Sequence, residues 1–600
     1  MLNNPFTIIS PEDLNAELAH QLFVEVYSDF PQVKNAGHSM IIGARGSGKS
    51  MIFRCLLPDV LKLTEMCEFK DLEFVSFHIP IKNTSLKITE LNALDKHHAS
   101  FMINEHFFVL NILMQILNSL IKLSESDLSY DEKIYADFLD VYTRKLRLQG
   151  CKTMGEINAN SAVEFFTQLY DHAEEMNADF IQYLLKINDI EDGLSYKYNL
   201  PILSFQGFIV PVLKALKKLP EVGNKNIYLF IDDADNLNKC QTQILNTWLS
   251  SRTTPTICLK VSTQIGKYKS FVTTNGTSVE APHDYQEINI SEKYTTSKSN
   301  YYDRIRRIVE KRLSLAGIEH VTPEEFFPQY EPQIRAINKE KQRLIDDWEK
   351  NGRGNRAIDD ASRYAIPNYI RDLGGNRKQR SKYMYAGFET LVHLSSGVVR
   401  LFLDSAAAMY DLEISTGKSK NINRISYSVQ NKVAREKADE FLYSQFRRME
   451  TDEDVLSGNL DNVQKLQNLI FSMGKTFHDI LVDTERSERR VFSIALSNTP
   501  TQEMKNILEL GVQNGYLHKS YIGTKDGAGR TWLYILNRYI SPVFVLDPTS
   551  FAGYLFLKND NIINAMETGA RLKSIYDLKN DDNDENVQLS LFDMEGDIDE

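Results

Sequence analysis

The residues best suited to chemistry form a glycine-rich segment that matches the pattern GxxxxGK[ST]. Glycines let successive backbone N–H groups point at one anion, which favours the binding of phosphate groups. Lys49 adds a cation for the β- and γ-phosphates, and the hydroxyl of Ser50 is a hard oxygen ligand for Mg²⁺. The pattern therefore predicts a site for ATP and Mg²⁺ that is formed by Gly43, Ala44, Arg45, Gly46, Ser47, Gly48, Lys49, Ser50 and Met51.

Two adjacent acids follow the apolar run 228–231. A site that hydrolyses ATP needs a carboxylate on a neighbouring strand to hold the magnesium shell, and we assign this role to Asp232, with Ser50 as the other metal ligand. The next position places a carboxylate near the attacking water. Asp233 is therefore the predicted catalytic base, with Asp235 as an additional acid beside it.

The elements that position these residues alternate between strands and helices. Apolar runs predict strands at residues 39–43, 72–81, 227–231 and 256–262, and helical patterns predict helices at 51–63 and 240–250. The glycine segment thus lies between a strand and a helix, the context in which this pattern binds phosphate. The alternation predicts an α/β fold with the doubly wound parallel sheet of P-loop NTPases. The long stretch 88–198 has few Gly or Pro residues and is predicted to be a helical insertion.

Five segments together resemble the AAA+ ATPases, and within them the initiator clade related to origin-recognition ATPases. The segments are Asn4-Pro5-Phe6, residues 43–50, residues 231–237, Val261-Ser262-Thr263 and residues 396–400. The likeness covers about residues 1–545. It implies an ATP-dependent switch that works as an oligomer. Many relatives carry Glu where this chain has Asp233, so we expect slow hydrolysis that is stimulated by DNA or by a partner.

The resemblance also implies residues that sense the nucleotide. A polar residue at the end of the strand after the acids senses the γ-phosphate, and it matches Ser262 or Thr263, of which we select Thr263. An arginine that opens a lid helix contacts the nucleotide, and Arg400 matches it. The implied catalytic residues are therefore Lys49, Asp233, Arg400 and Thr263. The arginine finger given to a neighbouring protomer stays open among Arg252, Arg304, Arg306 and Arg307.

The C-terminal region resembles a winged helix. A helix at 502–514 precedes two strands at 516–522 and 531–536, which a glycine-rich segment joins. In initiator ATPases such a helix meets the DNA groove and the wing touches the backbone, so the predicted phosphate contacts are Lys505, Lys519, Lys525 and Arg530. Glu503 and Glu509 dilute the charge of the helix, so a winged helix that binds protein stays an alternative.

A basic stretch at 351–385 is the second candidate DNA contact. It holds three acids and interleaved tyrosines beside eight basic residues, namely Arg353, Arg356, Arg363, Arg371, Arg377, Lys378, Arg380 and Lys382. Cations bind phosphates and tyrosines stack on bases, so duplex and single-stranded DNA are both candidate ligands. The alternative is a solvated loop of the lid.

The end of the chain holds one apolar peptide within an acidic tail. Residues 577–600 contain ten acids and one lysine, so most of the net charge of −12 lies there and the rest of the chain is near neutral. The peptide Gln588, Leu589, Ser590, Leu591, Phe592 resembles the bacterial motif that binds the sliding clamp. The resemblance implies a bacterial or phage-borne protein that works near replicating DNA; a segment that packs on its own domain is the alternative.

Bulk composition sets the remaining limits. The chain has 600 residues, of which 42% are hydrophobic and 25% are charged, as in globular proteins with several domains. Its five cysteines form no CxxC pair, which argues against zinc and disulfide frameworks. Apolar runs such as 107–117 are shorter than a membrane span, so we expect a cytoplasmic protein with no membrane contact.

These patterns predict four regions: an ATPase core at 1–290 with the insertion at 88–198, a helical lid with a basic insertion at 291–415, a linker helix and winged-helix domain at 416–575, and a disordered acidic tail at 576–600. The leading hypothesis is an initiator-like ATPase that assembles on DNA in an ATP-dependent way. The alternative is a signalling or anti-phage defence ATPase whose nucleotide-controlled oligomer activates a separate effector protein.

Overall fold

The four predicted strands are present and belong to one parallel sheet. They are β1 (Ser39–Gly43), β2 (Phe74–Pro80), β3 (Asn226–Asp232) and β4 (Ile257–Gln264), and the strand order is β2-β3-β4-β1-β5. The fifth strand, β5 (Gln286–Asn289), pairs with β1 at one edge. The sequence pattern does not predict β5, because Ile288 is its only buried residue and no apolar run marks it. The predicted α/β fold is confirmed.

The chain divides into two units. The sheet unit comprises Ile9–Gly43 and Gly48–Ser291, and the helical unit comprises Met1–Ile8, Ala44–Ser47 and Glu292–Glu600. Four residues of the glycine-rich loop therefore group with the helical unit, whereas the strand before them and the helix after them belong to the sheet unit. The computed structural model describes residues 4–24, 30–83, 100–151, 154–188, 201–251, 255–290, 300–351, 357–375, 382–416, 422–451, 460–523, 529–549 and 553–574.

The helix after the glycine-rich loop is shorter than predicted. The sequence predicts one helix over 51–63, but the structure has α3 (Lys49–Cys55) and then α4 (Pro58–Glu65). Pro58 has no backbone N–H and disfavours helical geometry at the residue before it. Leu57 is accordingly extended, and Pro58 takes the first position of a new helix.

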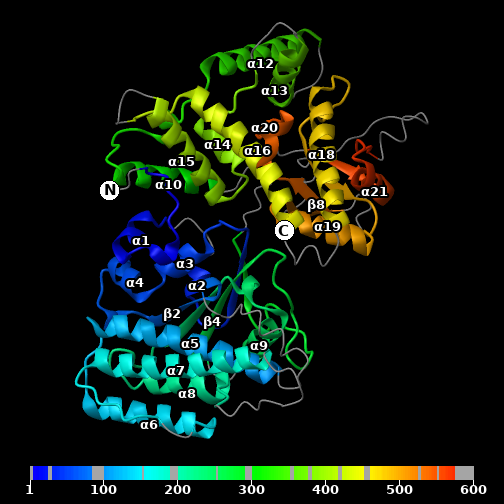
Figure 1. Cartoon of the computed structure of the whole chain (residues 1–600). Coiled ribbons are helices and arrows are strands. Elements are labelled where there is room, and N and C mark those ends of the chain that lie inside the picture. Colours follow the sequence, from blue (N-terminus) through cyan, green and yellow to red (C-terminus); the bar gives the residue numbers. More distant parts are fainter. Residues whose placement is uncertain are drawn as a thin grey trace, which may run out of the picture. The chain divides into compact units, whose positions relative to one another are not determined.

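The predicted helical insertion consists of three long helices in the described part of the chain: α5 (Ser100–Ser124), α6 (Glu132–Leu148) and α7 (Ala162–Asn188). α5 packs on β2 and on α9 (Lys239–Ser250), and α7 packs on α5. Figure 1 shows α5, α7, α8 (Val210–Leu216) and α6 in layers beside the sheet. These helices share one hydrophobic core with the sheet, so the insertion is an integral part of the sheet unit.

One helix within the described residues is long and apolar enough, by length and composition alone, to cross a membrane. This segment, Phe101–Ser124, corrects the expectation that apolar runs here are too short. Its buried face supplies side chains such as Phe107, Phe108 and Leu113 to the core of the sheet unit. A helix enclosed in a protein core passes the same test of length and composition.

The sheet unit also contains two short helices, α1 (Ala16–Leu22) and α2 (Phe30–Lys34).

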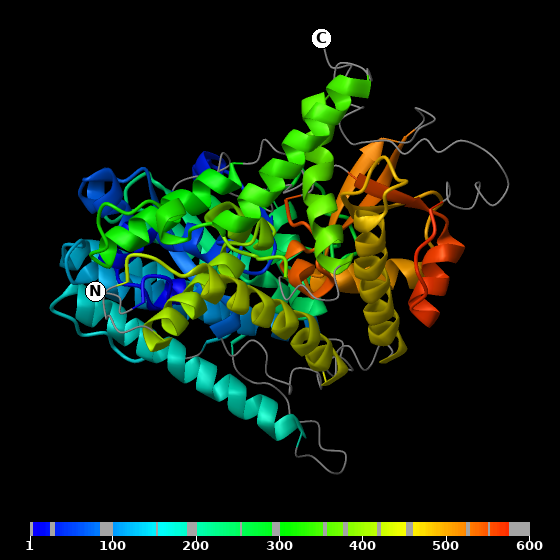
Figure 2. The same cartoon turned by 90° about the horizontal axis from the view of Figure 1, so that it is seen from above.

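The helical unit begins with the lid helices. They are α10 (Tyr301–Leu315), α11 (Pro323–Phe326), α12 (Glu331–Asn351), α13 (Ala357–Gly375), α14 (Phe388–Leu394), α15 (Val399–Thr416) and α16 (Tyr427–Thr451). The predicted lid helix that Arg400 opens is α15, and α16 lies in the region that is predicted to hold the linker helix. α12 and α13 pack side by side as a hairpin, which Figures 1 and 2 show in green.

The N-terminal residues 4–8 form a strap that is built into the lid. The ring of Phe6 is completely buried among Phe326, Phe327 and Tyr410. The amide nitrogen of Asn4 donates to the carbonyl of Ala407 at 3.0 Å and to the carboxylate of Asp411 at 2.9 Å. In addition, Arg312 donates to the carbonyl of Pro5 at 2.8 Å. The strap therefore fixes the start of the chain to α10, α11 and α15.

The C-terminal domain has the predicted helix and hairpin of a winged helix, with two added strands. It contains α18 (Leu460–Val482), β6 (Val491–Leu496), α19 (Gln502–Gln513), β7 (Leu517–Gly523), β8 (Arg530–Leu536), α20 (Ser541–Phe544), β9 (Gly553–Leu557) and α21 (Asn559–Thr568). The helix and hairpin predicted from residues 502–536 are confirmed. The pattern did not predict β6 or β9, which pair in parallel and extend the hairpin to the order β7-β8-β6-β9.

Candidate active site

The glycine-rich loop joins β1 to α3 through residues in the left-handed region. Gly46 has a φ of +83° and Gly48 has a φ of +104°, values that a residue with a Cβ adopts only at a cost. The loop turns sharply enough for α3 to begin at Lys49. The Lys49 ammonium is buried and donates to the carbonyl of Gly43 at 3.0 Å. The side chain of Lys49 therefore lies against the glycine-rich loop, where it is predicted to bind phosphate.

The carboxylate of Asp232 is enclosed by hydrogen-bond donors. Its Oδ1 accepts from the hydroxyl of Ser262 and, at 3.0 Å, from the N–H of Asp233. Its Oδ2 lies 3.3 Å from Nε2 of His78 on the neighbouring strand β2. Burial alone would raise the pKa of Asp232, but hydrogen bonds from His78, Ser262 and Ser50 outweigh it and hold the pKa below its ordinary value. Asp232 is therefore a carboxylate that stays ionised although it is buried.

Asp233 has a different environment from its neighbour. It is a non-glycine residue with a φ of +56°, and its backbone N–H donates to the Ser262 hydroxyl at 2.9 Å. Burial, together with the charges of Asp232 and Asp235, raises the pKa of Asp233 to about 6, although Lys49 and Lys82 act in the opposite direction. A carboxylate with a raised pKa accepts a proton better than an ordinary aspartate.

The structure distinguishes between the two hydroxyl residues at the end of β4. The Ser262 hydroxyl is buried and contacts both the side chain of Asp232 and the backbone of Asp233. The Thr263 hydroxyl lies 3.4 Å from the carbonyl of Gln264. Successive side chains of a strand point to opposite faces, so only one of the two can meet the acids. The selected residue, Thr263, is therefore not the one that the structure brings to Asp232.

Asp235 lies at the next turn of the same segment. Its Oδ1 accepts from the backbone N–H of Gln264 at 3.0 Å. Gln264 is the last residue of β4 and is in register with Gly43, where the glycine-rich loop begins. Asp235 therefore ties the acidic turn after β3 to the end of β4.

Arg400 contacts the glycine-rich loop within the helical unit. Its backbone N–H donates to the carbonyl of Gly46 at 3.2 Å. A Cβ added at Gly46 would lie 2.5 Å from the Cβ of Arg400, closer than real side chains approach. Gly46 is therefore required both by its backbone angle and by the presence of α15. The predicted lid arginine and the predicted loop are thus adjacent.

The candidate arginine fingers differ in exposure. Arg304 is only 2% exposed, which leaves it unable to reach another chain. Arg306 is part-exposed and pairs with Glu310 at 3.2 Å. Arg307 is exposed on α10, and Arg252 lies outside the described residues. Of the three described residues, Arg307 is the one that is exposed, as a contact with a second protomer needs.

The side chains present fit a magnesium nucleotide. Oxygen ligands suit Mg²⁺, which takes few of them from the protein and the rest from phosphates and water. Ser50 and Asp232 offer two such oxygens, and they are close enough for Ser50 to lower the pKa of Asp232. In the part of the chain that the structure describes, no cluster of three or more His, Cys, Asp or Glu residues could hold a metal by itself.

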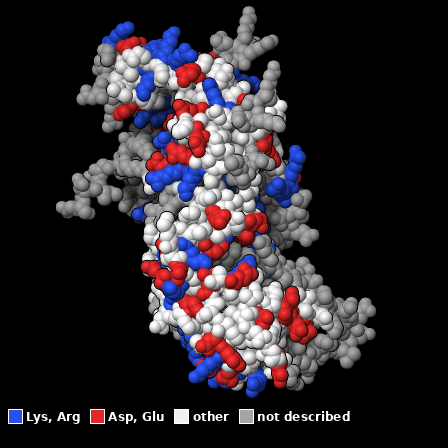
Figure 3. Space-filling model, turned by 90° about the vertical axis from the view of Figure 1, so that its left-hand side faces the viewer, with Lys and Arg blue, Asp and Glu red and all other residues white. Residues whose placement is uncertain are grey.

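The predicted DNA contacts are only partly available. Arg363 lies 3.9 Å from Glu488, and Arg371 lies 3.1 Å from Asp372. Lys382 and Arg530 are exposed, and Lys505 is part-exposed on α19. Figure 3 shows basic and acidic side chains intermixed on the face that it presents. The residues Arg353, Arg356, Arg377, Lys378, Arg380 and Lys525 and the peptide 588–592 lie outside the described residues.

Lys519 takes part in a cluster on the outer side of the hairpin. Its ammonium lies 3.9 Å above the ring centre of Trp532, and it is 3.8 Å from Glu509. Tyr521, which is 53% exposed, has its ring centre 4.2 Å from that of Trp532. The cation is thus held by an aromatic face and by an acid of α19.

Sequence reasoning did not identify His78 or Lys82 as members of the acidic site. His78 lies two residues before the end of a strand that the apolar run predicts. Only the register between β2 and β3, in which Pro80 is opposite Asp232, brings His78 to that carboxylate. Lys82 follows β2 directly and acts on Asp233 by its charge. A sequence does not give the register between strands that lie about 150 residues apart.

Comparison with known proteins identifies the family of the chain. The model of the ORC-CDC6-like family matches residues 4–557. No curated protein matches the chain. Among solved structures, Cdc6p from Pyrobaculum aerophilum is 12% identical over 94% of this chain and 98% of its own, with a TM-score of 0.27. The Orc1 protein of Aeropyrum pernix, solved in complex with DNA, is 9% identical over 91% and 96%, also with a TM-score of 0.27.

The family match covers most of the chain. The chain belongs to the ORC-CDC6-like family of AAA+ ATPases.

Proposed function

We propose that this protein is a slow ATP-hydrolysing switch that assembles on DNA while ATP is bound. The observation that carries the proposal is the acidic turn after β3. There, one hydroxyl and two adjacent carboxylates are held together beside the lysine of a glycine-rich loop. Membership of the ORC-CDC6-like family supports the same class of activity.

Each residue of the cluster has one task in this proposal. The loop N–H groups and Lys49 would bind the phosphates, and Ser50 and Asp232 would hold Mg²⁺, which would supply positive charge beside the phosphates. Ser262 and His78 keep the Asp232 carboxylate oriented and ionised. Asp233 accepts a proton from the attacking water. Arg400 couples the conformation of the loop to that of the lid, because its backbone N–H donates to the carbonyl of Gly46.

Two surfaces of the helical unit supply the DNA contacts in this proposal. The first is the winged helix, with Lys505 on α19 and Arg530 on the hairpin. The second is the basic stretch, of which Lys382 is exposed. We also propose that the protein assembles into an oligomer in which Arg307 is the arginine finger. Its proposed location is the cytoplasm.

The test is ATP hydrolysis by the purified chain, alone and with duplex or single-stranded DNA. Lys49→Ala should abolish nucleotide binding, and Asp233→Asn should retain binding but lose hydrolysis, because the amide cannot accept the proton. A rate that DNA raises supports the whole proposal. If DNA leaves the rate unchanged and only a partner protein stimulates it, the DNA part of the proposal is wrong.

A further inference from the structure

The turn that precedes α15 contains a serine in a conformation that serine rarely adopts. Ser396 has a φ of +51°, and Gly397 after it has a φ of +80°. The left-handed region costs a non-glycine residue about 1 kcal/mol or more, so it persists only where other contacts hold it. The side chain of Ser396 is 1% exposed, which places these contacts inside the helical unit.

Strand β7 of the wing hairpin and the segment that follows β8 both reach this one hydroxyl. The oxygen of Ser396 accepts from the backbone N–H of Arg538, which follows β8, at 3.2 Å. The same oxygen lies 3.1 Å from Nε2 of His518, which belongs to β7. Burial and the charge of Arg538 lower the pKa of His518 to about 4, so the ring is neutral at neutral pH and can accept the hydroxyl hydrogen.

The same turn determines where Arg400 lies. The backbone N–H of Val398 donates to the carbonyl of Ser395 at 2.9 Å, which closes the turn. Two residues later the N–H of Arg400 donates to the carbonyl of Gly46 in the glycine-rich loop. A change in the angles of Ser396 would therefore rotate the start of α15 and move Arg400 against Gly46.

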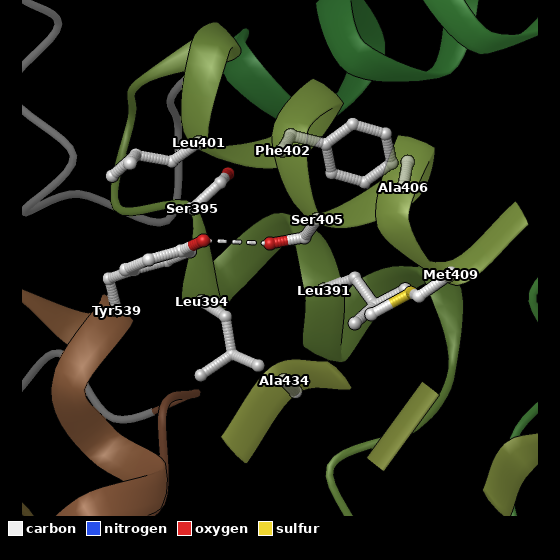
Figure 4. A pocket seen from close by; sticks show the side chains of 10 residues that line it. All are labelled: Leu391, Leu394, Ser395, Leu401, Phe402, Ser405, Ala406, Met409, Ala434 and Tyr539. Carbon is white, nitrogen blue, oxygen red and sulfur yellow. Dashed lines mark hydrogen bonds between the residues drawn. The ribbon is translucent and has the colours of Figure 1, made fainter. Parts of the chain in front are cut away.

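A small pocket lies beside α15. Figure 4 shows a pocket lined by Leu391, Leu394, Ser395, Leu401, Phe402, Ser405, Ala406, Met409, Ala434 and Tyr539. These residues come from α14, the turn after it, α15, α16 and the segment after β8. The one hydrogen bond drawn across the pocket joins the hydroxyls of Ser405 and Tyr539 at 2.9 Å.

We propose that Ser396 and His518 are positioning residues through which the wing hairpin sets the position of Arg400 at the glycine-rich loop. Binding of DNA at the hairpin and binding of nucleotide at the loop then influence each other by the same factor, as linkage requires. This inference rests on the proposed function and names the contact that joins its two ligands.

The first experiment needs no DNA. It measures the affinity of the full chain for a fluorescent ATP analogue in the wild type, His518→Ala, Arg400→Ala and the double variant. We expect His518→Ala to weaken binding about fivefold, the effect of one hydrogen bond. It should have no further effect once alanine has removed the Arg400 side chain, which is predicted to contact the nucleotide. Equal effects of His518→Ala in both backgrounds would overturn the inference.

Three matched variants separate positioning from general loss of packing. His518→Gln can place a polar atom near the site of Nε2 and should restore most of the affinity. Ser396→Gly keeps the backbone angle without strain but removes the hydroxyl, so it should fold and behave like His518→Ala. Tyr539→Phe removes the nearby hydrogen bond to Ser405 and should leave the affinity unchanged. A loss for Tyr539→Phe as large as for His518→Ala would contradict the proposal.

The second experiment repeats the affinity measurement with saturating duplex DNA. The wild-type affinity should change, and that change should disappear in His518→Ala. A wild type that binds no nucleotide would contradict the proposed function itself. Nucleotide binding that DNA alters equally in the wild type and in His518→Ala would overturn only the coupling through this turn.

Discussion

At the scale of single residues, the acidic turn places two adjacent aspartates in opposite electrostatic environments. Donors surround Asp232 and hold its pKa low, whereas two other carboxylates and burial raise the pKa of Asp233. The hydroxyl of Ser262 contacts both residues, because it donates to the carboxylate of Asp232 and accepts from the backbone N–H of Asp233. Ser262 therefore fixes Asp232, the predicted ligand of Mg²⁺, and Asp233, the predicted catalytic base, with respect to each other.

Ser262→Ala should lower ATP hydrolysis at least about tenfold, since it removes a buried hydrogen bond from each aspartate. Thr263→Val is the matched control, because its hydroxyl has only the carbonyl of Gln264 nearby at 3.4 Å. Steady-state hydrolysis and nucleotide affinity measure the two effects separately. A larger loss for Thr263→Val would restore Thr263 as the sensing residue.

Gly46→Ala should weaken nucleotide binding and destabilise the protein more than a left-handed angle alone explains. The added Cβ would overlap Arg400 in addition to straining the backbone. Gly276→Ala is the control, because Gly276 has a similar φ of +84° and nothing within 4 Å of its added Cβ. Thermal unfolding and nucleotide affinity are the measurements, and equal effects of both variants would contradict the contact with α15.

Much of this site could be predicted from sequence, because local patterns specify it. The glycine-rich loop and the two acids after an apolar run depend on spacing within a few residues. The choice between Ser262 and Thr263 depends on which face of β4 meets β3, and the contact of His78 depends on the register of β2. Residue spacing along the chain predicts neither the orientation of β4 nor the register of β2.

At the scale of elements, the lid and the winged-helix domain are fastened together by buried polar contacts. The hydroxyl of Tyr385 lies 2.9 Å from the carbonyl of Leu546 and 3.2 Å from that of Ser541. Arg435 of α16 donates to the carbonyl of Tyr383 at 2.9 Å and to that of Pro542 at 3.2 Å. The linker helix therefore joins the two parts along its length.

Tyr385→Phe should lower the stability of the helical unit by about 1–3 kcal/mol, because it leaves the buried carbonyl of Leu546 without this donor. Tyr443→Phe is the control, since Tyr443 is 42% exposed and its ring contact with Phe471 survives the change. Hydrogen exchange of the strands β6 and β8 reports the unfolding of this unit. Unchanged exchange in Tyr385→Phe would show that the contact contributes no stability.

The sequence predicts long and strongly patterned elements better than short ones. The helices of the insertion and the hairpin of the winged helix follow from periodicity and glycine content. The break before Pro58 divides one predicted helix into two, although proline at that position is a recognised signal for it. Strand β5 is recognisable only once β1 is known to need a partner, because three of its four residues are exposed.

At the scale of the whole molecule, buried neutral histidines link stability to pH. Burial lowers the pKa of His106 to about 3, and burial with a nearby cation lowers the pKa of His38 and of His518 to about 4. His106 is fully buried and its Nδ1 accepts from the N–H of Leu203 at 3.0 Å, which only the neutral ring can do.

The stability that His106 contributes is complete above pH 6.5, its unfolded pKa, and is lost as the pH falls toward about 3. At pH 5 the loss should be about 2 kcal/mol for this residue. His106→Asn keeps an acceptor near Nδ1 but does not titrate, so it should lose less stability than the wild type between pH 7.5 and pH 5. Urea unfolding at both pH values tests this, and parallel losses would contradict it.

The N-terminal strap has a consequence for how the protein can be divided. Residues 4–8 fill the aromatic core of the lid, although about 290 residues of chain separate them from α10. A fragment that starts at residue 292 would lack Phe6 and would expose a ring-sized hole among Phe326, Phe327 and Tyr410. A synthetic peptide of residues 1–8, added to this fragment, should bind the lid as a separate ligand and restore the stability of the fragment.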